Sequence, residues 1–281
     1  MTEDAAPLSV PGDLARRLRA GEVVVGPLLF DLLTPGLAVT LADVGWDFVL
    51  LDLEHAPFDA SQVASFMLAG RHAGLATIVK LPDLERSGVQ RYLDYGAAGI
   101  QAPHVETVEE VRRLVRWSRY PPDGERGQVF GLGNTGFQLV DRDRYVREAN
   151  AGILTLAMIE TRAGVEAVDV ILEGGPDVVF IGTGDLSSSY GVPGQMTHPI
   201  VLEAAERVLA ACKQRSVAVA INAEEPSVAR RWIERGVQMI ACSSDLSMIR
   251  RQSEQLLAPL ADLLSSRGPG ASTDAARTGQ A

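Results

Sequence analysis

The chain has 281 residues, of which 46% are hydrophobic and 22% charged, a composition that indicates a globular protein with a large core and excludes a disordered or fibrous one. The formal net charge is −10 and no Lys/Arg-rich stretch is interleaved with aromatic residues, so we expect no nucleic-acid partner. No apolar run approaches the roughly 20 residues that span a bilayer, and the acidic N-terminus (MTEDAAPLSV) lacks a signal-peptide pattern, so we expect a cytoplasmic protein without a membrane partner.

Short apolar runs alternate with helical patterns along the chain. Each run is rich in aliphatic or β-branched residues and follows a turn signal, which is typical of buried strands. In the intervening segments, such as 61–73 and 201–213, apolar residues recur every three or four positions, and Thr107 begins a capping box with Glu110. The predicted strands are residues 23–30, 48–52, 77–81, 99–104, 153–160, 178–182, 217–222 and 239–243.

Eight strands that alternate with helices favour a closed parallel (β/α)8 barrel, a TIM barrel, over an open sheet, which more often has about five to seven strands. No GxGxxG motif follows the first strand, which argues against a dinucleotide-binding fold. We expect a single barrel domain at residues 1–264, with a helical lead-in at its N-terminus, and a disordered Gly/Ser/Ala-rich tail at 265–281. The last predicted helix, 246–264, is long enough to reach a neighbouring subunit.

The catalytic groups of a parallel barrel sit at the C-terminal ends of its strands. At those ends this sequence has one basic residue, two histidines and several carboxylates. They are Asp52, Glu54 and His55 after the second strand, Lys80 on the third, His104 on the fourth, Glu160 on the fifth and the loop 182–185 after the sixth. We therefore expect these side chains to converge on one face of the barrel.

Two pairs among these residues indicate a catalytic function, and for each pair a purely structural role is the alternative. Glu160 and Asp185, on adjacent strand ends, suit a hard divalent cation that keeps positions open for substrate oxygens. The alternative is that Glu160 pairs with Arg162 and that Asp185 caps the following helix. Asp52 could orient the imidazole of His55 as a general base near neutral pH, whereas the alternative is a purely structural histidine.

Four segments add a more specific signal because they occur together in one order and spacing. They read LDLEHAP at 51–57, RYPPDGERG at 119–127, MIET at 158–161 and GTGDLS at 182–187. In this combination the chain resembles the HpcH/HpaI family of metal-dependent (class II) pyruvate aldolases, over about residues 12–260. The resemblance implies a (β/α)8 barrel whose C-terminal helix is exchanged between subunits, in a homo-oligomer that is commonly a hexamer built as a trimer of dimers.

The resemblance also implies an activity, that of an aldehyde-lyase. Its substrates would be a 2-oxo acid and an aldehyde, and it would cleave or form 4-hydroxy-2-oxo acids through a pyruvate enolate. The implied cofactor is a divalent metal (Mg2+, Mn2+ or Co2+) bound by Glu160 and Asp185, and pyruvate would chelate this metal.

Further site residues follow from the same resemblance. The loop whose backbone amides would meet the pyruvate carboxylate contains Thr183, Gly184 and Asp185. Asp52 and His55 would act together as the base, through a water on the metal. Asp94 matches a residue that reaches a neighbouring active site in the family, and its alternative is a surface carboxylate at a helix end.

Lys80 is the main departure from the family pattern. The family usually has an arginine there, in an Arg-x-Pro segment where it contacts the oxygen that becomes the enolate, whereas this chain reads Lys80-Leu81-Pro82. The charge is kept but the planar bidentate guanidinium is lost. Three outcomes stay open: the same electrostatic role, a changed reaction that includes a Schiff base on Lys80, or a lost activity.

Other departures lie around the substrate. Met158 replaces a glutamine of several family members, and His104 replaces a residue that is often methionine. The acceptor aldehyde is therefore left open, and so is a second reaction class on the same metal site, namely a decarboxylase or a biosynthetic aldol or Michael-type enzyme. A catalytically silent barrel is a third possibility, against which the joint presence of the candidate catalytic residues argues.

Overall fold

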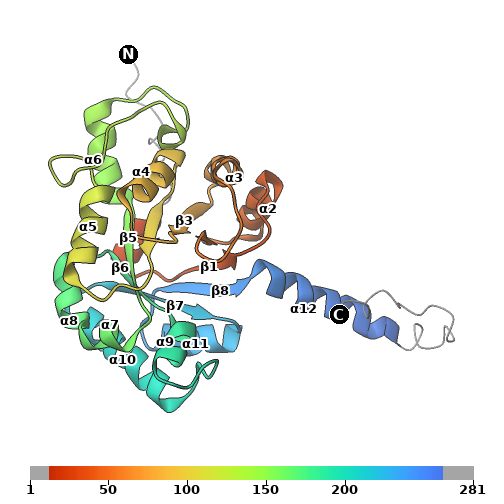
Figure 1. The fold of residues 1–281 in the computed structure, drawn as a ribbon. Helices are drawn as coiled ribbons and strands as arrows, with labels where there is room; N and C mark the ends of the chain where they lie inside the picture. The colour runs from red at the N-terminus through yellow and green to blue at the C-terminus, as the bar shows by residue number, and fades with distance from the viewer. Residues whose placement is uncertain (1–12, 262–281) are drawn as a thin grey trace, which may run out of the picture. The chain divides into compact units, whose positions relative to one another are not determined.

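The computed structural model describes residues 13–261, and its centre is a closed barrel of eight parallel strands (Figure 1). Each strand pairs with its neighbours in sequence, and the last strand pairs with the first, so the sheet has no free edge. The strands are β1 (Val24–Leu29), β2 (Phe48–Asp52), β3 (Ala76–Lys80), β4 (Gly99–Ala102), β5 (Leu154–Ile159), β6 (Val178–Ile181), β7 (Ala218–Ala223) and β8 (Met239–Ser244). The predicted (β/α)8 architecture is confirmed, and each of the eight predicted strands overlaps an observed one.

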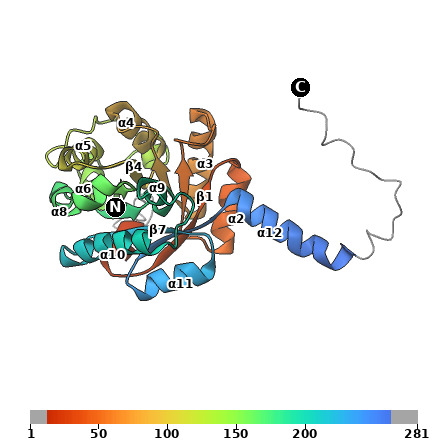
Figure 2. The same cartoon turned by 60° about the horizontal axis from the view of Figure 1, so that its bottom comes forward.

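Helices that connect successive strands lie outside the barrel (Figure 2), while α1 precedes β1 and α12 follows β8. They are α1 (Leu14–Arg19), α2 (Pro35–Val44), α3 (Ala60–Ala73), α4 (Arg86–Tyr95), α5 (Val108–Ser118), α6 (Arg142–Gly152), α7 (Arg162–Glu166), α8 (Val168–Ile171), α9 (Thr183–Ser189), α10 (Pro199–Gln214), α11 (Pro226–Glu234) and α12 (Asp245–Leu257), with 3-10 turns η1 (Gly133–Thr135), η2 (Leu172–Gly174) and η3 (Ala258–Leu260). The predicted capping box is confirmed at the start of α5, where the Glu110 carboxylate accepts the Thr107 N–H at 2.9 Å.

The chain divides into two compact units at the start of α12. The barrel unit ends at Asp245, whose Oδ2 accepts the backbone N–H groups of Asp31 and Leu32 at 2.9 and 2.8 Å. The second unit begins at Leu246, and the predicted tail 265–281 lies outside the described residues. Between residues 13 and 261, no helix has the length and apolar character that a membrane crossing requires.

The strands alternate their side chains between two apolar clusters, which we call the inner and the outer cluster. On β2, Phe48 and Leu50 belong to the inner cluster, while Val49 and Leu51 belong to the outer cluster together with residues of the surrounding helices. The same period of two holds on β5, where Leu154, Leu156 and Met158 are in the inner cluster. This alternation decides which side chain at each strand end points into the barrel.

Candidate active site

The inward-pointing residues of several strands end in a polar residue at the C-terminal mouth of the barrel. On β2 the series Phe48, Leu50 continues to Asp52, and on β3 the series Ala76, Ile78 continues to Lys80. Asp52 and Lys80 are 2% and 4% exposed. Such a charged pair is tolerated at the bottom of the mouth only because each charge meets an opposite one.

Asp52 shapes the turn that follows β2. Its Oδ1 accepts the backbone N–H groups of Glu54 and His55 at 2.9 and 2.8 Å. The expectation that Asp52 orients the His55 ring directly is corrected here, because Asp52 binds the backbone of His55. The ring Nε2 lies 3.5 Å from Glu54 Oε2, and the side chain is 59% exposed at the mouth. Asp52 therefore positions His55 through the turn, and Glu54 is the carboxylate beside the imidazole.

Lys80 lies between two carboxylates. Its Nζ is 3.2 Å from Asp52 Oδ2 and 2.6 Å from Glu54 Oε2. Burial by itself acts to lower the pKa of Lys80, but the hydrogen bond to Glu54 and the surrounding negative charges outweigh it and raise that pKa above its ordinary value. The amine is held as an ammonium group, a fixed positive charge at the floor of the site.

Glu160 follows β5, where the inner series of Leu156 and Met158 continues to it. The side chain is 1% exposed. Its Oε1 accepts the backbone N–H of His104 at 2.8 Å, while its Oε2 accepts no hydrogen bond from any residue between 13 and 261. Burial is the main cause that raises the pKa of Glu160, and the nearby charge of Asp185 acts in the same direction. A buried carboxylate oxygen without a donor is a position where a cation is expected.

His104 joins the carboxylates of two strand ends. Its ring Nδ1 lies 3.2 Å from Glu160 Oε1, and its Nε2 lies 3.4 Å from Glu54 Oε1. The backbone of His104 has φ 48°, in the left-handed region that a non-glycine residue rarely adopts. This conformation directs both the N–H and the ring of His104 toward Glu160, so the residue belongs to the site.

The loop after β6 approaches Glu160 closely because it begins with a glycine. A Cβ on Gly182 would lie 2.8 Å from Glu160 Cβ and 2.9 Å from its Oε2. Asp185 is exposed in the first turn of α9, whose N-cap is Gly182. The alternative that Asp185 caps this helix is therefore wrong. The other alternative paired Glu160 with Arg162, but the Arg162 guanidinium lies over the Tyr190 ring, 4.8 Å from its centroid.

Asp94 lies on α4, within a second polar group. Its Oδ1 is 2.9 Å from Arg126 Nη2, and its Oδ2 accepts a hydrogen bond from Gln90 at 2.8 Å. Arg126 is fully buried and also lies over the Tyr120 ring, 4.4 Å from its centroid. The single chain holds Asp94 in this group, and its contact with a neighbouring site stays a prediction.

The structure thus brings together most of the predicted site and adds to it. The side chains of Asp52, His55, Lys80 and Glu160 lie at the same end of the barrel. The charge of Asp185 acts to raise the pKa of Glu160. The structure gives Glu54 a role that its position after the second strand did not predict. Its carboxylate contacts one lysine and two histidines. The signal that could have found it was its place between Asp52 and His55 on a short turn.

Comparison with known proteins identifies the family of this chain. The family described as HpcH/HpaI aldolase/citrate lyase matches residues 28–251. The hydroxypyruvate/pyruvate aldolase of Paraburkholderia phytofirmans is 33% identical over 251 residues, covering 87% of this chain and 95% of that protein. The 5-keto-4-deoxy-D-glucarate aldolase of Klebsiella pneumoniae is 33% identical over 248 residues, covering 88% and 95%. The crystal structure of an HpcH/HpaI aldolase from Desulfitobacterium hafniense superposes with a TM-score of 0.84 at 33% identity, covering 89% of this chain and 96% of that one.

The family match runs from the first strand to α12, and the relatives align over nearly their whole length. Together with charged groups gathered at the C-terminal mouth, this defines a TIM-barrel lyase of the aldolase type. The chain belongs to the HpcH/HpaI aldolase/citrate lyase family.

Proposed function

We propose that this enzyme is a metal-dependent pyruvate aldolase, which cleaves or forms 4-hydroxy-2-oxo acids with pyruvate as the donor and an aldehyde as the acceptor. The observation that carries this proposal is the buried Glu160 Oε2, which has no hydrogen-bond donor between residues 13 and 261 and whose carboxylate is influenced by both Asp185 and Lys80. The names of the Paraburkholderia and Klebsiella relatives support a 2-oxo acid as the donor.

Glu160 and Asp185 are the residues that would hold the metal, which we propose to be Mg2+, Mn2+ or Co2+. Two carboxylates are the ligands that hard divalent cations prefer. Among the described residues, no group of three or more His, Cys, Asp and Glu side chains is arranged to hold a metal. Two protein ligands would leave positions open for substrate oxygens. A cation bound there would stabilise the negative charge that develops on the keto oxygen of the substrate.

The loop after β6 would orient the donor. Thr183, Gly184 and Asp185 begin α9, where the first backbone N–H groups have no partner within the helix. We propose that the pyruvate carboxylate accepts hydrogen bonds from these amides. Gly184 has open space where a Cβ would stand, so a carboxylate can approach its backbone.

His55 is the group that we propose to move the proton. Its exposed ring stands at the mouth, where it can reach a substrate methyl group or the hydroxyl of an aldol, directly or through one water. Glu54, 3.5 Å from the ring Nε2, would stabilise the imidazolium that forms after the proton is taken. Asp52 keeps the turn, and with it His55, in place.

The measurement that tests this function is deuterium incorporation into pyruvate in D2O, which requires no knowledge of the acceptor. We expect exchange at C3 with Mg2+, Mn2+ or Co2+ and loss of that exchange when a chelator is added. Absence of exchange with every metal would contradict the proposal and would direct attention to another 2-oxo acid or to a silent barrel.

Lys80 is proposed to stabilise the enolate as a fixed charge. Its raised pKa disfavours a Schiff base, because imine formation needs the neutral amine. We predict that Lys80→Arg keeps kcat within about threefold of the wild type or raises it, since the charge is retained and the donor geometry improves. Borohydride added with pyruvate should leave the mass of the protein unchanged. Loss of activity in Lys80→Arg together with a mass increase at Lys80 in the wild type would establish the imine instead.

A decarboxylase or a biosynthetic aldol or Michael-type reaction would use the same enolate. The products distinguish these reactions, since an aldolase in the cleavage direction releases an aldehyde and a decarboxylase releases carbon dioxide. We favour the aldolase because the Paraburkholderia and Klebsiella relatives both carry aldolase names.

We also propose a homo-oligomer, a hexamer built as a trimer of dimers, in which the C-terminal helix packs on a second copy. In α12 only Asp245 is buried. Five large apolar side chains between Leu246 and Leu260 are 45 to 64% exposed, and they recur at helical spacing. These are Leu246, Ile249, Leu256, Leu257 and Leu260. A second copy is the partner that would cover this face and bring Asp94 toward a neighbouring mouth.

A further inference from the structure

His104 has no role in the reactions proposed above, although it lies against a proposed metal ligand. Its side chain is 55% exposed at the mouth, and its ring Nδ1 is 3.2 Å from Glu160 Oε1. The backbone N–H of the same residue donates to the same oxygen at 2.8 Å. One residue therefore meets Glu160 Oε1 twice, through its main chain and through its ring.

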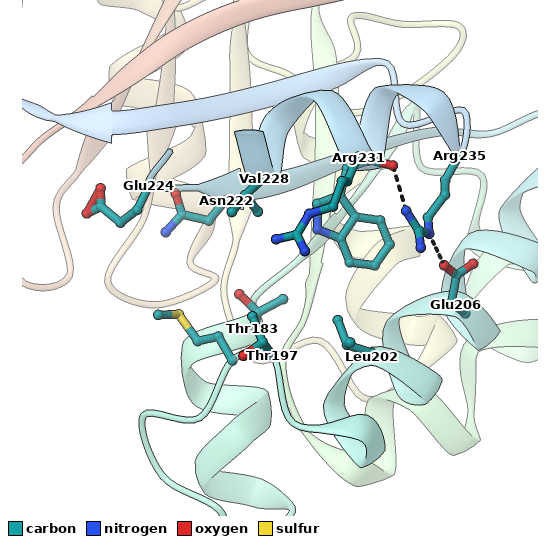
Figure 3. Close-up of a pocket in the computed structure, with 11 residues that line it drawn as sticks. Thr183, Thr197, Leu202, Glu206, Asn222, Glu224, Val228, Arg231 and Arg235 are labelled. Atoms are coloured by element: carbon teal, nitrogen blue, oxygen red, sulfur yellow. Dashed lines mark hydrogen bonds and ion pairs between the residues drawn. The ribbon is translucent and has the colours of Figure 1, made fainter. Parts of the chain in front are cut away.

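The other oxygen of Glu160 is not held in this way. Its Oε2 accepts no hydrogen bond from any residue between 13 and 261, and it faces the loop after β6, where a Cβ on Gly182 would lie 2.9 Å away. That loop begins with a residue that has no side chain, and its next residue, Thr183, lines a cavity of about 270 Å3 between α10 and α11 (Figure 3). The orientation of the Glu160 carboxylate therefore depends on the groups at Oε1.

The main chain around His104 is fixed to β5. The Val105 N–H donates to the Met158 carbonyl at 3.0 Å, two residues before Glu160. Pro103 precedes His104, whose φ is 48°. Turns that place a proline before a residue of positive φ normally have glycine or asparagine there, because most side chains are strained in that conformation. A histidine at this position costs conformational free energy, which indicates that its ring contributes something that glycine cannot.

The ring is also confined on its other side. Its Nε2 lies 3.4 Å from Glu54 Oε1, and Glu54 is itself fixed because its Oε2 lies 2.6 Å from Lys80 Nζ. A rotation of the imidazole away from Glu160 would therefore also separate it from Glu54. The two carboxylates together keep Nδ1 beside the Glu160 oxygen.

We propose that His104 is a positioning residue for the metal ligand Glu160. Its ring Nδ1 donates to Oε1 beside the backbone N–H, and this orients the carboxylate so that Oε2 is presented to the cation. Groups that orient a metal ligand in this way typically contribute about 10- to 100-fold to metal affinity. The inference rests on the metal-dependent function proposed above and deepens it, because it assigns His104 to metal affinity and not to proton transfer.

The test measures Mn2+ affinity by calorimetry, without substrate, in two variants that both tolerate a positive φ. His104→Asn keeps an N–H donor close to the position of Nδ1, so its affinity should stay within about threefold of the wild type. His104→Gly keeps the backbone N–H but has no ring, and its affinity should fall about 10- to 100-fold. Wild-type affinity in His104→Gly, or a fall in His104→Asn as large as that in His104→Gly, would overturn the proposal.

His72→Asn is the matched control, since His72 is an exposed histidine on α3 whose Nδ1 contacts the Leu68 carbonyl at 2.8 Å. It should bind Mn2+ as the wild type does, and melting temperatures in chelator establish that all three variants are folded. A fall in His72→Asn equal to that in His104→Gly would also count against the proposal.

Cobalt distinguishes a positioning residue from a direct ligand, because the visible absorption of bound Co2+ depends on the atoms that coordinate it. At saturating Co2+, His104→Asn should have the spectrum of the wild type. A changed spectrum would show that a nitrogen of His104 is itself a ligand, and the positioning role would be wrong.

Mn2+ binding also separates this inference from the aldolase function, because the titration contains no pyruvate. If the variants bind Mn2+ as expected but deuterium exchange into pyruvate is absent, the positioning role stands and the aldolase function fails. If exchange is metal-dependent but His104→Gly binds Mn2+ as tightly as the wild type, the function stands and the positioning role fails. A wild type that binds no Mn2+ would contradict both.

Discussion

Glu160→Gln will abolish metal-dependent deuterium exchange into pyruvate while the barrel stays folded. The substitution keeps the size of the side chain and the acceptor for the His104 N–H, 2.8 Å away, but removes the negative charge. Loss of one group that stabilises developing charge commonly costs about 100- to 1,000-fold in rate, and loss of a metal ligand should cost at least that much. The exchange rate followed by NMR checks the activity, and calorimetry with Mn2+ checks metal affinity, which should fall with it.

Glu160→Gln should also affect stability in a way that depends on pH. Burial raises the pKa of Glu160 above its ordinary value of 4.5, so without metal the folded state favours the neutral acid. A group of this kind contributes stability at low pH that is lost as the pH rises through its folded-state pKa. In chelator, Glu160→Gln should therefore have a melting temperature at neutral pH no lower than that of the wild type, and the difference should shrink toward pH 4.5.

The matched control is Glu173→Gln, which changes an exposed carboxylate on η2. It should leave both exchange and metal affinity as they are. Full exchange activity in Glu160→Gln would contradict the metal assignment, and a large fall in its melting temperature would indicate a structural carboxylate instead.

His55→Ala should lose C3 exchange but retain metal binding. The side chain is 59% exposed, and Glu54 is the one ionic partner of its ring among residues 13–261, so its removal creates no cavity in the core. A positioned general base contributes about 100- to 10,000-fold, which is the loss that we expect in the exchange rate. NMR exchange measures the loss, and calorimetry with Mn2+ should give the wild-type affinity.

His72→Ala is the control for this prediction, because His72 is an exposed histidine on α3 whose Nδ1 contacts the Leu68 carbonyl 2.8 Å away. It should behave as the wild type. If His55→Ala loses metal instead of proton exchange, His55 is not the base. If it loses neither, His104 is the next candidate, since its ring contacts both Glu54 and Glu160.

The sequence by itself determined the barrel and the strand-end residues of the site. Buried strands require continuous apolar runs, and eight such runs alternating with helical patterns leave few other architectures. The C-terminal ends of the strands of a parallel barrel meet at one face. Asp52, Lys80 and Glu160 could be placed at the mouth because each lies at or beside the end of a predicted strand, without knowledge of a single contact.

Only the tertiary structure decided how these residues are connected. The turn after a strand has no period, so the sequence could not indicate that Asp52 binds the backbone of His55 and leaves the ring beside Glu54. The contact between Glu54 and His104 needs the pairing of β2, β3 and β4, which brings the ends of β2 and β4 to one mouth, and a positive φ at His104.

The same holds for Asp94, a carboxylate at a helix end until the segment after α5 places Arg126 Nη2 2.9 Å from its Oδ1. Periodic patterns are local and can be read along the chain. The pairing of charges depends on distances between segments that only the folded chain brings together.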